Sequence, residues 1–373
     1  GSIILDAVDS ITTPTAGTAN VKLGSNAGNS IASGGIRNVT VGDEAGTAIT
    51  TGTRNVAVGY QALTTEDTGS RSVGIGHQAL TTQNGGTADI YNVGVGHNAG
   101  GAITTGQLNT LIGGLTGDAL QDADKNVAVG AVALSSDTLG DKTTAVGYGA
   151  LSTQNFSSAV TDTENTAVGH AAGSVLTTGQ QNTLIGANAG VSATDDDHNT
   201  FVGYNAGGLV NGGFRNTFIG KSAGDAMTTG DKNIIIGTYN GNESDLGDIR
   251  TLSNYIVLSD GDGNSRVWVT GGSNQNQFFA TGIYLWTTSA SANVVVTSSA
   301  GHIARSTSAL KYKQDIRDLE DIDIDKFRPI RYKSKSDIDD QTKDHFGFIA
   351  DEVHDAGITE LVSYGDNDEV EGF

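Results

Sequence analysis

Apolar residues along positions 20–237 recur in a short unit, Asn-x-x-(Val/Ile/Leu)-Gly, instead of at the i, i+3, i+4 spacing of amphipathic helices. Nine of the twelve intervals between successive glycines of this unit are 17 residues long. A fixed period of this kind is typical of a chain wound into stacked coils. The sequence therefore predicts an all-β solenoid, whose coils are marked by Gly24, Gly42, Gly59, Gly76, Gly96, Gly113, Gly130, Gly147, Gly169, Gly186, Gly203, Gly220 and Gly237.

The residue before each of these glycines is aliphatic and nearly always β-branched, which favours a buried strand position. The residue two places earlier is usually Val or Thr and shares that face of the strand. We expect a coil to hold two short strands and two turns, and both faces of the strand to be covered. Because one such roll has little core, a parallel homotrimer is the simplest cover. The place between the two positions is also often apolar: Ala57, Leu111, Leu184, Phe201, Phe218 and Ile235.

Two further repeat positions predict contacts between coils. An alanine follows most of the glycines after three residues, and its small side chain indicates close packing between layers. The leading asparagine is expected to form a hydrogen-bonded ladder along the rod or to tighten each turn. The longer intervals are insertions, predicted as loops around 84–86 and 156–158.

These residues resemble the left-handed β-roll repeats of trimeric autotransporter adhesin heads and of related phage tail-fibre shafts. The resemblance covers about 220 residues and carries a similar Asn-x-Ala-Val/Ile-Gly-x-x-Ala pattern. It implies a trimeric shaft and does not specify a receptor.

Residues 250–307 change in character and are predicted to form a β-rich neck. Apolar runs at 255–258 and 266–269 flank an Asp-Gly-Asp-Gly-Asn turn and predict a hairpin, with further strands at 282–286 and 293–296. The acidic turn is a poor calcium loop, because Ser265 stands where an EF-hand needs glycine and no acid follows at the twelfth place.

From Ser308 onward, charged residues become frequent and glycine becomes rare. We expect a helix or turn at 318–322, strands at 327–333 and 345–350, and a helix at 351–354. This segment resembles the intramolecular chaperone domain of endosialidases and other phage tailspikes and fibres. That family continues into a long C-terminal helix, so we expect an incomplete copy here. The matching residues are Ser308, 310–316, Phe327, 329–333, 347–353, 361–362 and 371–372.

In that family the domain assists trimer formation and then cuts itself off. The resemblance implies that Ser308 is the nucleophile, Lys313 the base and Thr307-Ser308 the scissile bond. A lysine acts as a base only when its pKa is lowered by burial, and assembly would supply that burial. Ser306 and Lys311 have the same spacing and form the alternative dyad. Apart from this single-turnover peptidase reaction, no enzymatic activity is predicted.

Composition narrows the function classes. The formal net charge is -21, which disfavours nucleic acid and anionic membranes as partners. The chain has no cysteine and no apolar run long enough to span a bilayer. We expect no cofactor and no metal site.

Several other side chains are weaker candidates. His77, His97 and His170 occupy the same repeat place as Tyr60, Tyr148 and Tyr204, so an exposed aromatic stripe can contact glycans or can be a turn face without a ligand. Histidines gathered around a threefold axis are a less favoured metal site. The acidic residues 195–197 are expected to be solvated in a turn. No pair of carboxylates suited to glycan hydrolysis recurs in the repeats.

The sequence thus predicts a lead-in (1–19), a shaft (20–249), a neck (250–307) and a small α+β chaperone domain (308–373). The favoured function is a trimeric phage tail fibre in the virion tail, made in the host cytoplasm, that binds a bacterial surface receptor, with a glycan as the favoured class. Other virion tail proteins are expected partners. The alternatives are a tailspike depolymerase acting on capsule or lipopolysaccharide, and a cellular trimeric adhesin.

Overall fold

A computed structural model describes residues 17–243, 246–271, 278–280, 294–297, 302–305, 328–333, 344–355, 363–364 and 370–372. The chain divides into two compact units, Gly1–Thr287 and Thr288–Phe373. Each unit is described by itself below. Among the described residues, no helix is both long enough and apolar enough to cross a membrane.

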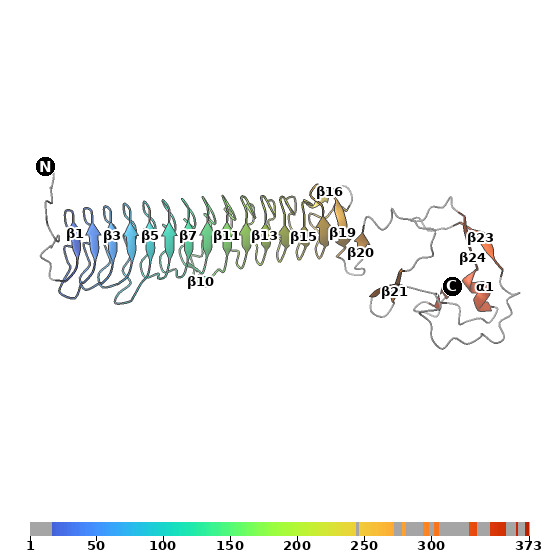
Figure 1. The fold of residues 1–373 in the computed structure, drawn as a ribbon, viewed down its shortest axis with the longest axis horizontal. Helices are drawn as coiled ribbons and strands as arrows, with labels where there is room; N and C mark the ends of the chain where they lie inside the picture. Colours follow the sequence, from blue (N-terminus) through green and yellow to red (C-terminus); the bar gives the residue numbers. More distant parts are fainter. Residues whose placement is uncertain are drawn as a thin grey trace. The chain divides into compact units, whose positions relative to one another are not determined.

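The first unit is a β-solenoid whose strands lie side by side along one axis (Figure 1). Its coils contribute the strands β1 (Val21–Leu23), β2 (Val39–Val41), β3 (Val56–Val58), β4 (Val73–Ile75), β5 (Val93–Val95), β6 (Thr110–Ile112), β7 (Val127–Val129), β9 (Thr144–Val146), β11 (Thr166–Val168), β12 (Thr183–Ile185), β13 (Thr200–Val202), β14 (Thr217–Ile219) and β15 (Ile234–Ile236). All of these strands pair in parallel, and equivalent repeat positions face each other, as in Thr200↔Thr217. The predicted solenoid of about 17-residue repeats is confirmed.

Each coil contains one three-residue strand, and most of the rest is turn and bend, so the expected second strand does not recur from coil to coil in the described shaft. Two-residue strands at 140–141, 161–162, 242–243 and 247–248 are the exceptions there. The reason lies in the backbone, because several residues of each coil have positive φ, which ends extended structure. In the coil around β13 these are His198, Gly203, Asn205 and Gly207, with φ values of 61°, 140°, 58° and 61°. Left-handed residues therefore make the corners of the coil, and a single strand fills its one straight side.

The glycine of the Asn-x-x-(Val/Ile/Leu)-Gly unit, called the marker glycine below, is required because its φ is positive and because the next coil leaves no room for a side chain. Gly203 shows this, because a Cβ placed on it would lie 2.3 Å from the carbonyl oxygen of Gly220 in the next coil. Any side chain there would push adjacent coils apart, and the sheet spacing does not permit this.

Buried asparagines form the predicted ladder along the shaft. Asn199 shows the pattern: its Oδ1 accepts from the Asn216 backbone N–H at 2.8 Å, and its Nδ2 donates to the Gly213 carbonyl at 2.8 Å. One amide thus satisfies a backbone donor and a backbone acceptor inside the protein. The same two bonds recur for Asn20, Asn38, Asn55, Asn92, Asn109, Asn126, Asn165, Asn182, Asn216 and Asn233.

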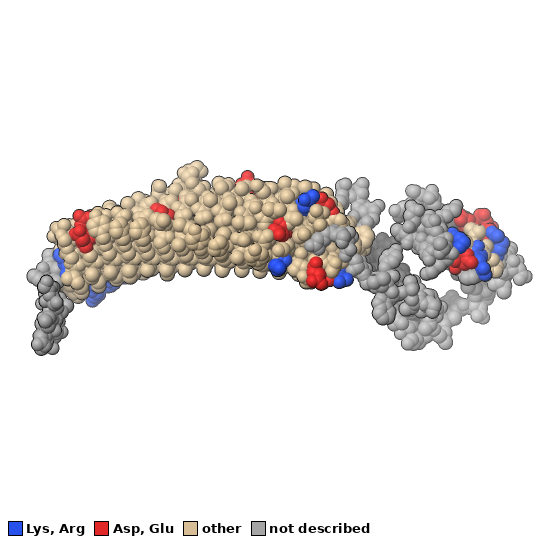
Figure 2. Space-filling model, turned by 90° about the horizontal axis from the view of Figure 1, so that it is seen from above, with Lys and Arg blue, Asp and Glu red and all other residues tan. Residues whose placement is uncertain are grey.

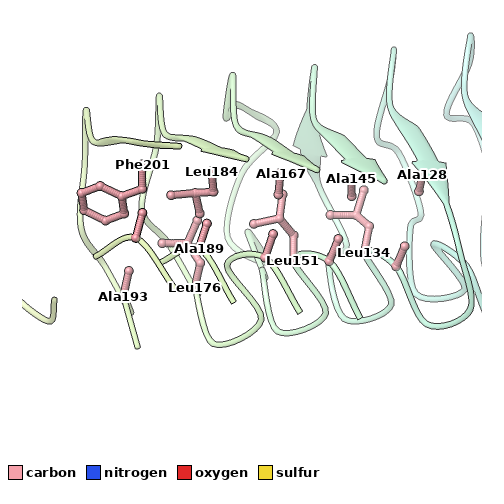
Figure 3. Packing of buried hydrophobic residues seen from close by; sticks show 14 of the residues in the cluster. Ala128, Leu134, Ala145, Leu151, Ala167, Leu176, Leu184, Ala189, Ala193 and Phe201 are labelled. Carbon is pink, nitrogen blue, oxygen red and sulfur yellow. The ribbon is translucent and has the colours of Figure 1, made fainter. Parts of the chain in front are cut away.

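The core is a continuous column made of the middle residue of each strand and two turn positions that face it (Figure 3). The predicted alanine after the glycine is buried in this column, as at Ala189 and Ala206. In most coils, the total side-chain volume is shared between two positions. A small strand residue is matched by a turn leucine, as in Ala128 with Leu134, and a large strand residue by a turn glycine, as in Phe201 with Gly207. A Cβ on Gly207 would lie 2.5 Å from the Phe201 ring, so the pair fills one fixed volume.

The structure decides which strand positions face the core of the single chain and which lie on the outer face of the strand row. The residue before each glycine lies on this outer face and is partly or fully exposed in the single chain, at 39% for Ile185 and 38% for Ile219. Phe201 and Phe218 lie on the opposite face, within the chain's own core, and their rings stack at 5.1 Å. A three-residue strand presents two side chains to one face and one to the other, and the turns place the single side chain inside.

The predicted hairpin ends the solenoid. β18 (Ile256–Ser259) pairs in parallel with β15 and antiparallel with β19 (Ser265–Val269), which pairs with β20 (Phe278–Ala280). Trp268 and Phe279 stack at 5.1 Å on this end of the sheet. Two short pairs lie beside the main sheet, β8 (Gly140–Asp141) with β10 (Thr161–Asp162) in parallel, and β16 (Asn242–Glu243) with β17 (Gly247–Asp248) antiparallel.

The described residues of the second unit form three short antiparallel pairs and one helix. β21 (Val294–Thr297) pairs with β22 (His302–Arg305), β23 (Ile330–Tyr332) with β24 (His345–Gly347), and β25 (Ser363–Tyr364) with β26 (Val370–Gly372). The helix α1 (Ala350–Asp355) follows β24. The strands expected at 293–296, 327–333 and 345–350 are present as β21, β23 and β24, the last two being only three residues long, and the helix expected at 351–354 is present as α1, which begins at Ala350. The segments 282–286 and 318–322 lie outside the described residues.

The ladder predicts a large effect for Asn199→Ala, since the variant leaves a buried N–H and a buried carbonyl without partners. At about 1–3 kcal/mol for each unsatisfied group, the free energy of unfolding should fall by roughly 2–6 kcal/mol. Chemical denaturation followed by circular dichroism measures the loss. The control is Asn211→Ala, because Asn211 is exposed and accepts only from the Thr194 hydroxyl. Equal stability of the two variants would contradict the role of the ladder.

The acidic triplet gives a second prediction. Asp195 is exposed, but Asp196 is buried, which corrects the expectation that the triplet is solvated. Burial raises the pKa of Asp196 to about 6, although its carboxylate accepts from the Gly212 N–H at 2.5 Å. A carboxyl with a raised folded-state pKa contributes stability below its unfolded pKa and loses that contribution as the pH rises through the folded pKa.

Asp196→Asn should therefore raise the unfolding temperature above that of the unmodified protein at about pH 7.5 and make little difference near pH 4. Differential scanning calorimetry at both pH values measures the two differences. Asp195→Asn should show a smaller gain of the same sign, because the neighbouring Asp195 charge also raises the pKa of Asp196. A gain from Asp196→Asn of the same size at both pH values would rule out ionisation as its cause.

Candidate functional site

The described part of the C-terminal segment is built around the β23–β24 hairpin and the helix α1. Tyr332 pairs with His345 and Ile330 with Gly347, so the two strands run side by side up to the start of the helix. Val353 is the buried residue of α1, which makes it the anchor of the helix. Apolar residues in alternate places on β23 and a single apolar stripe on α1 explain why these elements form locally.

Ion pairs join the elements of this segment. Arg328, just before β23, holds Glu352 of α1 through its Nε at 3.0 Å and through a second guanidinium nitrogen. This guanidinium lowers the pKa of the Glu352 carboxyl. Arg331 and Lys333 lie 3.4 Å and 3.5 Å from Asp344 oxygens. All of these groups are well exposed, so the pairs orient the hairpin and helix more than they stabilise them.

A shallow apolar hollow lies on the same hairpin. Pro329, Ile330, Arg331, Gly347 and Phe348 line about 510 Å³ of open space. An exposed apolar surface on so small a unit suits contact with another polypeptide better than it suits free solvent.

The predicted dyad does not lie in the described part of the chain. Ser308 and Lys313, the alternative pair Ser306 and Lys311, and the Thr307-Ser308 bond are all outside it. The assignment of the nucleophile, the base and the cleaved bond therefore remains a prediction from sequence.

The aromatic stripe predicted on the shaft forms ring stacks. Tyr60, His77 and His97 lie in one row: the Tyr60 and His77 rings are tilted by 38° at a centroid distance of 5.2 Å, and the His77 and His97 rings stack at 5.1 Å. Tyr148 and His170 form a second stack at 5.4 Å. The histidines are exposed, and Tyr60 and Tyr148 are 41% and 59% exposed. Within the described residues, no cluster of three or more His, Asp or Glu side chains has the arrangement of a metal site.

The acidic turn of the end hairpin is organised by its own residues. Asp260 accepts from the backbone N–H groups of Asp262 and Asn264, each at 3.0 Å, and from the Arg266 Nε at 2.9 Å. The Asn264 amide and the Arg266 guanidinium together lower the pKa of the Asp260 carboxyl. A carboxylate that already faces a guanidinium is a poor ligand for calcium.

Sequence reasoning missed a buried polar network at each insertion. Where serine replaces the ladder asparagine, the Gln83 amide donates to the Ser72 hydroxyl at 2.9 Å and to the buried Glu66 carboxylate at 2.7 Å, and accepts from Asn92 at 2.9 Å. The same network recurs four repeats later.

In that second network, Gln154 contacts Asp137, Thr143 and Asn165 at 2.6–3.0 Å. The insertions are also closed by matching ion pairs, Arg71–Asp89 and Lys142–Asp162. The recurring Gln-Asn pair at 83–84 and 154–155 is the sequence signal that marks both networks.

Comparison with known proteins agrees with this organisation. Residues 308–363 match the model of a protein family described as the chaperone of endosialidase. Searches of curated proteins and of solved structures gave no significant match. The family match and the solenoid confirm the predicted resemblance to a phage fibre with a C-terminal chaperone domain. The chain therefore combines a β-solenoid shaft with a C-terminal segment, residues 308–363, that matches the model of the endosialidase chaperone family.

Proposed function

We propose that this chain is part of a trimeric phage tail fibre in the virion tail that attaches to a bacterial surface, and that its C-terminal chaperone directs assembly and is released by Ser–Lys autoproteolysis. The observation that carries the proposal is the combination of a chaperone segment with a shaft that leaves one strand face uncovered. A chaperone for assembly is needed only where chains must be brought together.

The outer strand face has the character of an assembly surface. Along the whole shaft its two positions hold Val, Ile, Leu or Thr and no charged residue. Figure 2 shows a different side of the shaft, seen from above the view of Figure 1, where scattered charged side chains are present. A continuous apolar stripe of about 60 Å, from thirteen coils at about 4.8 Å each, is too large to remain in water on a soluble rod. Packing against two further copies would cover it.

The chaperone would solve a register problem. Because every coil resembles the next, three shafts can pair out of step by one repeat with nearly the same contacts. Such repetitive, non-local pairing is slow and prone to wrong associations. A C-terminal domain that trimerises first would fix the register and raise the effective concentration of the shafts.

Release would then make assembly irreversible. The Ser308 hydroxyl would attack the Thr307 carbonyl carbon while giving its proton to a neutral Lys313. The Thr307–Ser308 C–N bond would break, with Lys313 returning the proton to the Ser308 nitrogen, and water would hydrolyse the ester to the Thr307 carboxylate and the free Ser308 hydroxyl. The lysine would be neutral only when the assembled trimer buries it, so cleavage would report correct assembly. The mature shaft would then be kinetically trapped.

The outer face gives a direct test of trimerisation. A lysine at Ile219 would bury a charge against partner chains, so Ile219→Lys should yield monomers or aggregates, with the coils themselves intact because the side chain points away from the core. Light scattering gives the mass and circular dichroism the β-content. Leu209→Lys is the control, since Leu209 is 56% exposed in a turn away from the strand face. A stable monomer of the unmodified chain would refute the proposed assembly.

Cleavage is tested by mass spectrometry of the expressed chain. The protein should be cut between Thr307 and Ser308, and Ser308→Ala and Lys313→Ala should each leave it intact, whereas Ser306→Ala should still be cut. Loss of cutting in Ser306→Ala alone would instead identify Ser306 and Lys311 as the dyad. An uncut but trimeric unmodified chain would separate the assembly role from autoproteolysis.

A further inference from the structure

The residue directly after the glycine that marks each coil forms one column along the shaft, and six of the thirteen members of this column are rings. In chain order it holds Ser25, Asp43, Tyr60, His77, His97, Gly114, Ala131, Tyr148, His170, Ala187, Tyr204, Lys221 and Thr238. Backbone hydrogen bonds keep successive members one coil apart, as between the Asn188 N–H and the His170 carbonyl and between the Asn205 N–H and the Ala187 carbonyl, both at 2.9 Å. Positions in the column are therefore comparable from coil to coil.

The rings at positions 60, 77 and 97 show how much space lies between two rings that are two coils apart. His77 lies between Tyr60 and His97, with ring centroids 5.2 Å and 5.1 Å away. A flat ring thus fits between rings that are two coils apart and contacts both. At Ala187 the flanking rings are again two coils apart, His170 on one side and Tyr204 on the other, but the middle position carries only a methyl group.

The faces that border Ala187 are open. Tyr148 covers one face of His170 at 5.4 Å, and the next residue of the column, Ala187, carries no ring that could cover the other face. Tyr204 is 54% exposed and has non-aromatic neighbours in the column, Ala187 and Lys221. Two steps of the sheet separate His170 from Tyr204 by about 9.6 Å, which is the separation that one intercalated ring requires.

We propose that the place above Ala187, between His170 and Tyr204, binds a hexopyranose ring of a surface glycan. A pyranose has two flat C–H faces that stack on aromatic rings, and its edge carries hydroxyls for hydrogen bonding. Asn188 adjoins the place directly in sequence, is half-buried, and makes no hydrogen bond through its side chain to another residue in the described part of the chain. Asn205 also adjoins it, with its amide oriented by Asp225. The side-chain amides of Asn188 and Asn205 are therefore the proposed hydrogen-bond partners of the sugar hydroxyls.

The column remains accessible in the proposed trimer. It includes Asp43 and Lys221, and burying such charges at an interface without partners is costly. The strand positions proposed for trimer contact hold no charged residue at all. The sugar would therefore bind on the solvent side of each shaft, in three symmetric copies, and three weak sites would give the avidity that surface attachment needs.

The other gap in the column does not offer the same site. Gly114 and Ala131 separate His97 from Tyr148 by three coil steps, about 14 Å, which is too far for one ring to contact both faces. The geometry therefore singles out Ala187.

The test uses the full chain and three probes, methyl β-galactopyranoside, methyl α-glucopyranoside and N-acetylglucosamine, with sorbitol as a ringless polyol. Saturation-transfer NMR should show contact at the ring protons of at least one pyranose and none for sorbitol. Ala187→His places the protein's own ring in the site and should abolish binding without removing any contacting residue. Tyr204→Ala removes one wall and should weaken binding by about tenfold or more.

Tyr91→Ala is the matched control, because Tyr91 is 47% exposed but lies outside the column. Its binding should equal that of the unmodified chain. Absence of binding by all three sugars, or undiminished binding by Ala187→His, would overturn the proposal. The inference rests on the proposed function for the source of the sugar, but the experiments can refute the sugar site and the fibre assembly independently. A trimer that binds no pyranose refutes the ring site alone, and a monomer that binds one refutes the fibre assembly alone.

Discussion

The hydrogen bonds of the buried asparagine ladder are the constraint on which the shaft depends. A coil with only one three-residue strand leaves many backbone groups at its corners, and those facing inward cannot reach water. Each ladder asparagine satisfies one donor of its neighbouring coil and one acceptor of a turn, as Asn199 does with Asn216 and Gly213. Polar groups of one coil thus find their hydrogen-bond partners in the neighbouring coil, so a coil is stable only as part of a stack.

The same dependence explains the two insertions. Extra residues shift the chain so that the ladder cannot continue, and serine or threonine stands where asparagine would be. Gln83 and Gln154 reach across instead, each joined to a buried carboxylate and to the next asparagine. The same glutamine network replaces the missing asparagine at both insertions. Without it, the break in the ladder would leave buried polar groups without hydrogen-bond partners.

The shaft's thinness links its architecture to its proposed biology. The core is one column wide, with volume shared between pairs such as Ala128–Leu134 and Phe201–Gly207, so the chain can cover only one face of its strands. The uncovered face favours association with identical copies, and the repetitive contacts make register the difficult step. A C-terminal chaperone segment is the kind of device that such a chain requires. The exposed turn side is then free to vary between coils, as the ring column does.

The sequence by itself determined the coil period, the parallel all-β class, the asparagine ladder, the buried alanines and the chaperone segment, because each is a local pattern repeated or matched over many residues. It also implied the dyad of Ser308 and Lys313, which rests on that resemblance alone. Only the tertiary structure decided which strand face is inside, that Asp196 is buried, that one strand serves each coil, and that Ala187 lies between two rings. These features depend on the direction in which left-handed corner residues turn the chain, and that direction is set by the stacking of neighbouring coils.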